Sequence, residues 1–304
     1  MIGITGASGQ LGQIILDKLL AQMAAEKIVA ISRTPDLASH DGVISRSGDF
    51  DEIDGLVKAF SGLEKLVIIP TRDLRPGKRE AQHLNAINAA IQAGVGHILF
   101  ISACGTGSGD DNILDECYFP PEQALMRGAK TWTILRMSIY QEVLLDQAKQ
   151  SLAKAEEDHY PGKVAYVASE AAPGTLVSTN SARISYVSRD DVASAVAGIL
   201  LGNHHHGMIY NATGPDSWGL KEKAELISQV ARKPFTAQEI SPEKYAQGLR
   251  QANLPEYMVN MVLNFEAHIA RSGYDVVTGD IKHITGQEPE SLADFLIRHR
   301  QALV

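Results

Sequence analysis

Three glycines near the start of the chain have the type and spacing to form a phosphate-binding turn. Gly6, Gly9 and Gly12 follow the apolar run Ile2–Thr5 and stand three residues apart, ahead of a segment with helical periodicity. In a strand–turn–helix unit the first glycine permits the tight turn, the second lets backbone approach a pyrophosphate, and the third lets the helix pack on the strand. Amides at the helix start are unpaired and favour an anion. The pattern predicts that a dinucleotide binds at Gly6, Ala7, Ser8, Gly9, Gln10, Leu11 and Gly12.

The end of the next apolar run indicates which dinucleotide is preferred. A carboxylate about 20 residues past the glycines would bind the ribose 2′-hydroxyl of NAD, whereas a cation accommodates the 2′-phosphate of NADP. Here the run ends in Arg33, flanked by the hydroxyls of Ser32 and Thr34, and Glu26 stands at the wrong end of the strand to meet the ribose. Arginine presents a planar fork of donors to phosphate, so NADP(H) is predicted ahead of NAD(H). The alternative is that Arg33 is an ordinary surface arginine.

Two further pairs of residues fall where a dinucleotide would pass. Asp49 and Phe50 follow the third apolar run, where a carboxylate and a backbone amide can reach the adenine, and Pro70 and Thr71 end the fourth, beside the ribose. Asp and Pro are also common in ordinary turns. Their predicted place at the carboxyl edge of the sheet favours contact with the ligand.

The elements that must position these residues alternate between strands and helices. Apolar runs rich in β-branched residues alternate with helical periodicity through the first two hundred residues, which is typical of βαβ units and an α/β fold with a doubly wound parallel sheet. A helix is expected from Arg79 to Ala93, ended by Gly94. Strands are expected at Ile2–Thr5, Ile28–Ser32, Val43–Arg46, Leu66–Ile69, Ile98–Ser102, Thr131–Leu135 and Met208–Asn211.

The second half of the chain predicts a smaller, mostly helical C-terminal domain. A long helix is expected from Ile139 to about Glu157, followed by a polar stretch in which Val164–Ala168 is a possible strand. The patterns assign residues 1–155 and 183–213 to a dinucleotide-binding domain, and residues 156–182 and 214–304 to a capping domain that contacts substrate. Its predicted helices are Leu220–Arg232, Pro242–Gln251, Pro255–Arg271 and Ser291–Gln301.

Composition excludes several function classes. The 304 residues are 44% hydrophobic and 21% charged, which suits one large or two smaller buried cores. A formal net charge of −8 opposes binding to nucleic acid. No apolar run has the roughly 20 residues of a membrane span, and no basic segment precedes the first run, so a cytoplasmic protein is expected.

The cysteines and the histidine run predict neither a disulfide nor a metal site. Cys104 and Cys117 are too few for a disulfide framework, and Asp115 and Glu116 would oppose a reactive thiolate. The run from His204 to His206 has no further ligand at suitable spacing, so no metal is expected.

Taken together, these motifs resemble the NmrA-like group of atypical short-chain dehydrogenases, with the NADPH-dependent quinone reductases closest. The resemblance implies a Rossmann domain with strand order 3-2-1-4-5-6 plus an added strand, and a C-terminal domain that closes a cleft over the nicotinamide. Some members reduce quinones, whereas others sense the NADPH/NADP ratio through a partner protein. The motifs are ITGASGQLG at the start, Ser32-Arg33, Gly48-Asp-Phe50, Gln82 to Val95, Thr133-Ile-Leu-Arg136, Tyr186 to Asp191 and Asn211-Ala-Thr-Gly-Pro215.

The chain departs from ordinary short-chain dehydrogenases because it has no Tyr-x-x-x-Lys pair, in which lysine lowers the pKa of a proton-donating tyrosine. Tyr118 has Glu122 four residues on, and a carboxylate there would raise the pKa of the tyrosine. Isoflavone-reductase-like relatives tend to carry a lysine where this chain has Gln123. Alcohol–ketone chemistry is therefore disfavoured, and a sugar-nucleotide epimerase ranks last among the alternatives.

A quinone needs less help, because hydride transfer makes an aromatic hydroquinone anion that solvent can protonate. Ser102, at the end of the fifth strand, and Tyr140 are the residues predicted to contact nicotinamide or acceptor. The first hypothesis is an NADPH-dependent reductase of a quinone-like small molecule. The second is a cofactor-binding redox sensor without turnover. Whether the chain forms a homodimer or has a regulatory partner stays open.

Overall fold

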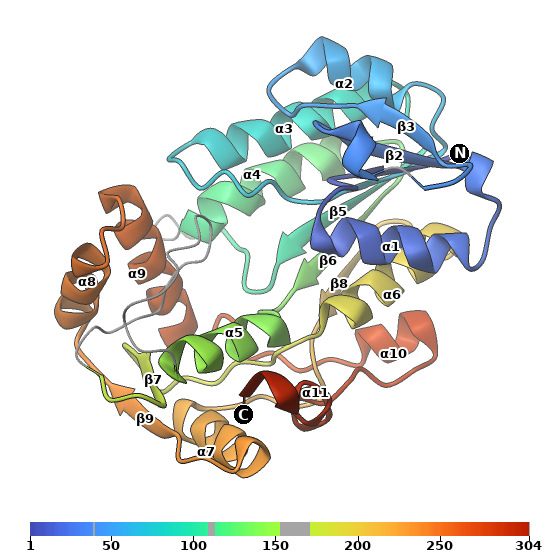
Figure 1. Ribbon diagram of the computed structural model, residues 1–304. Coiled ribbons are helices and arrows are strands. Elements are labelled where there is room, and N and C mark those ends of the chain that lie inside the picture. Colours follow the sequence, from blue (N-terminus) through green and yellow to red (C-terminus); the bar gives the residue numbers. More distant parts are fainter. Residues whose placement is uncertain (39, 109–112, 153–170, 304) are drawn as a thin grey trace. The chain divides into compact units, whose positions relative to one another are not determined.

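The computed structural model describes residues 1–38, 40–108, 113–152 and 171–303 (Figure 1). Its contacts divide the chain into two compact units. The first unit contains Met1–Met137, Arg189–Ala212 and Gly279–Glu288. The second unit contains Ser138–Ser188, Thr213–Thr278 and Pro289–Val304.

A parallel sheet of seven strands forms the centre of the first unit. Its order is β3-β2-β1-β4-β5-β6-β8, with every neighbouring pair parallel. This is the Rossmann order 3-2-1-4-5-6 with one added strand, so the predicted fold class is confirmed. The strands are β1 (Ile2–Thr5), β2 (Ile28–Ser32), β3 (Ile44–Ser47), β4 (Lys65–Ile68), β5 (His97–Ala103), β6 (Trp132–Met137) and β8 (Met208–Ala212).

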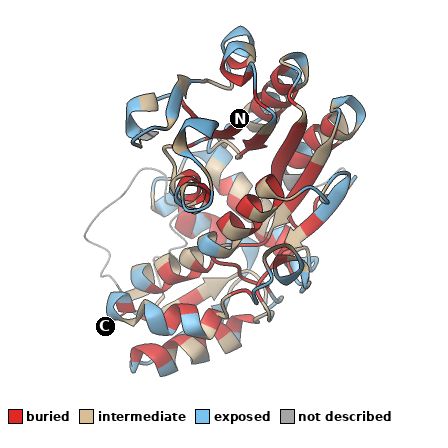
Figure 2. Ribbon diagram, turned by 90° about the vertical axis from the view of Figure 1, so that its right-hand side faces the viewer, coloured by how far each residue is buried: buried red, intermediate tan, exposed pale blue. Residues whose placement is uncertain are grey.

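Helices cover both faces of this sheet, which explains why its central strands are continuous apolar runs. One layer contains α2 (Ile53–Phe60), α3 (Lys78–Gln92) and α4 (Ile113–Gly128), which pack on one another in that order. The other contains α1 (Gln10–Leu20), α6 (Arg189–Leu201) and α10 (Asp280–Thr285) (Figure 1). Every residue of β1, β2 and β5 is buried (Figure 2).

The second unit is mostly helical, as predicted for the C-terminal region. Its helices are α5 (Gln141–Leu152), α7 (Leu220–Ala231), α8 (Pro242–Gln251), α9 (Glu256–Ala270) and α11 (Leu292–Arg298). It also holds a two-stranded parallel sheet of β7 (Thr175–Ser178) and β9 (Thr236–Glu239). Strand β9 is not predicted from the sequence, because it reads Thr-Ala-Gln-Glu and is mostly exposed.

One other sequence expectation differs from the structure. Helix α5 was expected to belong to the first domain, whereas its contacts place it in the second compact unit. It is described from Gln141 to Leu152, and the possible strand Val164–Ala168 lies outside the described residues. The division falls at the end of β6 because the chain leaves the sheet there.

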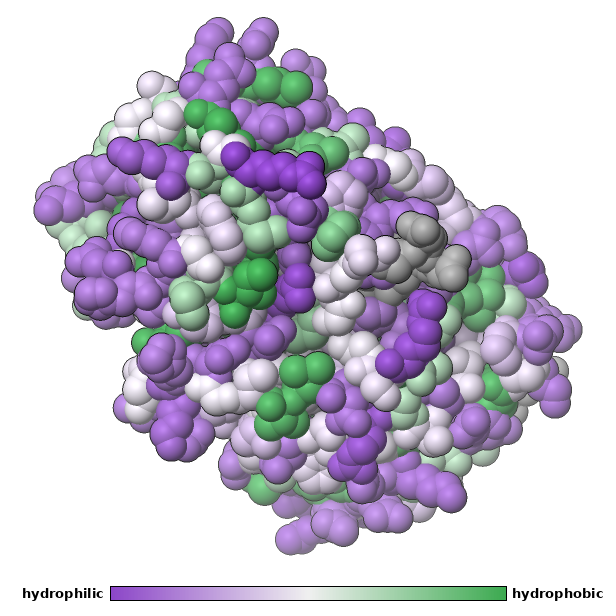
Figure 3. All heavy atoms as spheres, turned by 180° about the vertical axis from the view of Figure 1, so that it is seen from behind, coloured by the Kyte–Doolittle hydropathy of each residue, from purple (hydrophilic) through white to green (hydrophobic). Residues whose placement is uncertain are grey.

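In the part of the chain that the structure describes, no helix has the length and apolar character to cross a bilayer. Hydrophilic side chains prevail on the face drawn in Figure 3, with hydrophobic ones in small separate groups.

Candidate functional site

The turn between β1 and α1 depends on its glycines. Gly6 has a φ of +61°, which glycine adopts without strain. A Cβ on Gly12 would lie 2.3 Å from the Gly6 carbonyl oxygen, so only glycine permits this approach of helix to turn. The first backbone bond of the helix runs from the Gln13 amide to the Gly9 carbonyl over 2.9 Å. The amides of residues 10–12 precede that bond, at the positive end of the helix, where an anion would be favoured, so the turn fits a pyrophosphate.

A side chain that sequence reasoning missed holds this turn in place. The Gln13 Nε2 group donates to the Ala7 carbonyl oxygen over 2.6 Å. The Ala7 amide in turn donates to the Ile31 carbonyl of β2 over 3.2 Å. Glutamine in a first helical turn reads as an ordinary helix former, so nothing in the sequence distinguishes Gln13.

Hydroxyl groups gather beside the glycine turn at the end of β2. The Ser8 and Ser32 hydroxyl oxygens lie 2.7 Å apart. Ser32 Oγ also accepts from the Thr34 amide at 3.1 Å. Arg33 lies between these two residues in sequence and is exposed. The end of β2 therefore places hydroxyls next to the turn, with an exposed arginine directly after Ser32 in the chain, and these are the group types that a 2′-phosphate requires.

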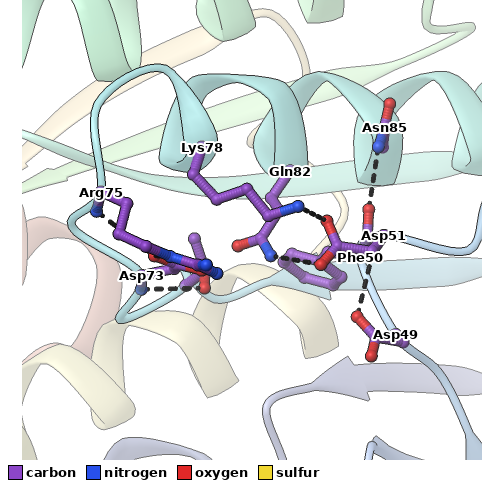
Figure 4. Close-up of polar contacts among 9 residues, drawn as sticks. Asp49, Phe50, Asp51, Asp73, Arg75, Lys78, Gln82 and Asn85 are labelled. Carbon is purple, nitrogen blue, oxygen red and sulfur yellow. Dashed lines mark hydrogen bonds and ion pairs between the residues drawn. The ribbon is translucent and has the colours of Figure 1, made fainter.

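The loop after β3 is bound to helix α3 (Figure 4). Asn85 Nδ2 donates to the Phe50 carbonyl oxygen over 3.0 Å. Within the loop, the Asp51 amide donates to Asp49 Oδ1 over 3.0 Å. These bonds fix the backbone of the predicted adenine-contacting pair, Asp49 and Phe50.

Two more side chains of α3 reach the same loop. Lys78 Nζ lies 2.8 Å from Asp51 Oδ1, and Gln82 Nε2 donates to Asp51 Oδ2 over 3.1 Å (Figure 4). The hydrogen bond from Lys78 is the main reason that the pKa of Asp51 is lowered. The carboxylate thus stays charged and keeps the loop against the helix.

The loop after β4 is held by a buried neutral histidine. The Thr71 amide, next to Pro70, donates to His83 Nε2 over 3.2 Å. The Nδ1 atom must then carry the ring proton, which it donates to the Cys117 carbonyl at 3.0 Å. Burial, with the charge of Arg79 as a second cause, lowers the pKa of His83 to about 3. His83 was not among the predicted residues.

The predicted cofactor-binding residues thus come together at one edge of the sheet. The glycine turn, Arg33, Asp49-Phe50 and Pro70-Thr71 follow the carboxyl ends of four adjacent parallel strands. This is where open α/β sheets bind ligands. Contact of each residue with cofactor stays a prediction.

Ser102, at the same edge, belongs to a buried polar network. Its hydroxyl donates to Glu122 Oε1 over 2.6 Å, and its exposed fraction is 0%. Arg136 donates to both oxygens of Glu122, from Nε over 2.9 Å and from Nη2 over 2.6 Å. Ser102 and Arg136 are register partners on β5 and β6. The network accounts for the burial of Glu122, whereas contact of Ser102 with nicotinamide or acceptor stays a prediction.

The pKa of Tyr118 is raised, in the direction that the sequence predicts, but the main cause is burial rather than Glu122, and the charge of Arg79 opposes the shift. The Tyr118 hydroxyl accepts from Arg79 Nη2 over 2.7 Å.

Both cysteines are poor nucleophiles. Burial raises the pKa of Cys104 to about 12 and also raises the pKa of Cys117. Neither forms a disulfide.

The histidine run contacts neighbouring rings. His205 Nδ1 lies 3.0 Å from the Tyr210 hydroxyl, and the His206 ring packs edge-on against His97. In the described ranges, no group of three or more His, Cys, Asp or Glu residues could hold a metal ion.

Tyr140 lies in the second unit, just ahead of α5, where it forms an isolated parallel bridge with Val187. It is partly exposed. The sequence predicts that Tyr140 and Ser102 both contact nicotinamide or acceptor; Tyr140 belongs to the second compact unit and Ser102 to the first. Its contact with nicotinamide or acceptor stays a prediction.

Comparison with known proteins agrees with this geometry. Quinone oxidoreductase 2 of Escherichia coli is 28% identical over 297 residues, covering 97% of this chain and 96% of that protein. The NAD(P)H azoreductase of Xenophilus azovorans is 22% identical, covering 99% of each chain. An NmrA-like family domain-containing oxidoreductase of Aspergillus flavus is 25% identical over 251 residues.

Solved structures show the same architecture. The crystal structure of the E. coli NADPH-dependent quinone oxidoreductase complexed with NADPH superposes with a TM-score of 0.85 at 27% identity, covering 98% of this chain and 99% of that one. The Citrobacter triphenylmethane reductase complexed with NADP(H) gives a TM-score of 0.81 at 25% identity, covering 99% of this chain and 100% of that one. A family model described as NAD(P)H-binding matches residues 6–202, which include the glycine turn and the strands β2 to β6 of the large sheet, but neither β1 nor β8. The chain is thus similar over almost its whole length to the E. coli quinone oxidoreductase, and over 80% of its length to the NmrA-like oxidoreductase of A. flavus. It belongs to the NAD(P)H-binding family whose model it matches.

Proposed function

We propose that the chain is an NADPH-dependent oxidoreductase that reduces a quinone or a similar small conjugated acceptor. The observation that carries the cofactor assignment is the glycine turn at the start of α1, where the Ser8 and Ser32 hydroxyls meet and the exposed Arg33 follows Ser32 in the chain. When bound, NADPH supplies a hydride. The acceptor class is taken from the quinone oxidoreductase, which the chain matches along almost its whole length.

The side chains of the first unit favour an acceptor that needs no dedicated acid. Tyr118 is fully buried against Arg79, and Glu122 is occupied by Arg136 and Ser102. A quinone suits such a site, because its reduced anion is an aromatic hydroquinone that water can protonate. Ser102 and Tyr140 remain our candidates for contact with nicotinamide or acceptor.

A non-catalytic NADP(H)-binding sensor that acts through a protein partner is the alternative. The burial of the network around Ser102 favours it, since a fully covered hydroxyl offers no open catalytic surface.

The first test combines turnover and binding. Loss of NADPH absorbance is followed with purified protein and a panel of quinones, and NADPH and NADH are titrated by calorimetry. We expect turnover with at least one quinone and tighter binding of NADPH. Tight NADPH binding without turnover would favour the sensor, and binding of neither nucleotide would contradict both proposals.

A further inference from the structure

The second unit contains a cavity of its own, formed by α5, β7, α7 and α9. The space open to a water-sized molecule is about 40 Å³, within a hollow of about 640 Å³ that includes its opening to solvent. Its inner wall is mostly apolar and includes Leu144, Leu176, Ile184, Leu220 and Ile269. Partly exposed side chains, among them Val143 and Phe265, also line it. An apolar cavity with a few polar groups is the usual form of a small-molecule site.

A buried lysine lines this cavity. Lys223, on α7, has an exposed fraction of 6%. Its ammonium donates to the Tyr186 hydroxyl over 3.2 Å and lies 5.4 Å from the centre of the Tyr186 ring. Among the described residues it makes no other hydrogen bond. A buried ammonium with unused donors is costly, so the cavity must supply an acceptor, either water or a ligand.

The charge of Lys223 is maintained in this surrounding. Burial lowers the pKa of Lys223 to about 8, and the negative charge of Glu266 opposes that shift. Glu266, which also lines the cavity, is 4% exposed and is fixed by donors from Ser178 Oγ at 2.7 Å and the Thr179 amide at 2.9 Å. At neutral pH the cavity therefore presents a charged donor.

Tyr186 and Lys223 form a tyrosine–lysine pair that the sequence does not reveal. The two residues are 37 positions apart in the chain. The chain lacks Tyr-x-x-x-Lys on one helix, yet tertiary structure brings the same two side chains together.

We propose that this cavity binds the carbonyl end of an aromatic acceptor, with the Lys223 ammonium donating a hydrogen bond to the carbonyl oxygen. The inference rests on the proposed function for the ligand class. The open space holds about three water molecules, which is room for a carbonyl group, while the partly exposed Val143 and Phe265 offer apolar surface to the ring.

The experiment measures binding of tetramethyl-1,4-benzoquinone to the full chain without cofactor, by calorimetry or ligand-observed NMR. This quinone has no open ring position to which a thiol could add. We expect saturable binding that Lys223→Met weakens about tenfold or more. The control is Lys221→Met on the same helix, which is exposed and should stay within about twofold of the parent chain.

Correct folding of Lys223→Met is checked by its thermal melt and by an unchanged NADPH affinity. If that variant does not fold, Lys223→Gln keeps a neutral donor and should show an intermediate loss. Unchanged quinone binding in the folded variant, or no saturable binding by the parent chain, would overturn the inference and leave water as the occupant.

The outcome is separable from that of the proposed function. Quinone turnover with an unchanged KM in Lys223→Met would refute the cavity assignment and keep the reaction. Quinone binding that depends on Lys223 without turnover would support the cavity assignment and contradict the proposed reaction.

Discussion

A Cβ on residue 12 would lie 2.3 Å from the Gly6 carbonyl oxygen and 2.8 Å from the Ala7 Cα. Both are backbone atoms, which cannot rotate away as a flexible side chain does. At the scale of single residues, the absence of one methyl group therefore lets α1 begin directly behind the turn. The same start leaves the amides of residues 10–12 for phosphate.

Gly12→Ala should weaken NADPH binding by about tenfold or more, because α1 must shift away from the turn, at a cost of about 1–3 kcal/mol. Calorimetric titration and a thermal melt measure the two effects. Gly279→Ala is the control, because a Cβ there meets no atom within 4 Å. Equal NADPH affinity in both variants would contradict a phosphate role for the turn.

Arg33→Ala should weaken NADPH binding about 10- to 100-fold and leave NADH binding almost unchanged, since charge-assisted hydrogen bonds to a phosphate contribute about 1.5–3 kcal/mol. The ratio of the two dissociation constants is the measurement. Equal losses of affinity for NADPH and NADH would contradict the predicted preference for NADP(H).

At the scale of elements, helix α3 acts as a support for two loops. Lys78, Gln82 and Asn85 are spaced so that they share one helix face, and they bind the loop after β3 (Figure 4). His83 binds the loop after β4. One helix therefore sets the position of both loops at the sheet edge.

Asn85→Ala should raise the NADPH dissociation constant about two- to tenfold, because the lost hydrogen bond to Phe50 contributes about 1 kcal/mol to holding the loop. Reduced nicotinamide mononucleotide lacks the adenine that this loop is predicted to contact, so the dissociation constant of this nucleotide should not change. Asn88→Ala, an exposed position on the same helix, is the matched control. An equal loss of affinity for NADPH and for reduced nicotinamide mononucleotide would indicate general damage to the fold.

At the scale of the whole molecule, two buried neutral histidines make stability depend on pH. Burial lowers the pKa of His97 to about 4, and that of His83 to about 3, from 6.5. His97 Nε2 must donate to Thr133 Oγ1 at 2.8 Å, because that hydroxyl itself donates to the His205 carbonyl. Both rings thus have tautomers set by their partners.

Stability should fall as the pH drops from about 6.5 to about 4, because the unfolded chain binds protons that the folded histidines exclude. Each histidine contributes a slope of up to ~1.4 kcal/mol per pH unit. Denaturant titrations between these pH values measure the free energy of unfolding. In His97→Gln, the slope of this free energy against pH should decrease by the contribution of one histidine. An identical slope in that variant would contradict the assignment.

Much of the first unit could be predicted from sequence, because its signals are local. The apolar runs gave the strands of the large sheet to within one or two residues at most ends, and Gly94 marked the end of α3. The exposed polar strand β9 was missed because its pairing with β7 is decided by a segment some sixty residues away.

By itself the sequence determined the Rossmann sheet and the glycine turn, since periodicity and a missing Cβ act within a few neighbouring residues. Only the tertiary structure decided the partners of polar side chains that are far apart in the chain. It joined Ser102 to Glu122 and Arg136, and Tyr186 to Lys223. The reason is that burial makes each such group require a partner, and the packing of whole elements determines which partner lies within reach.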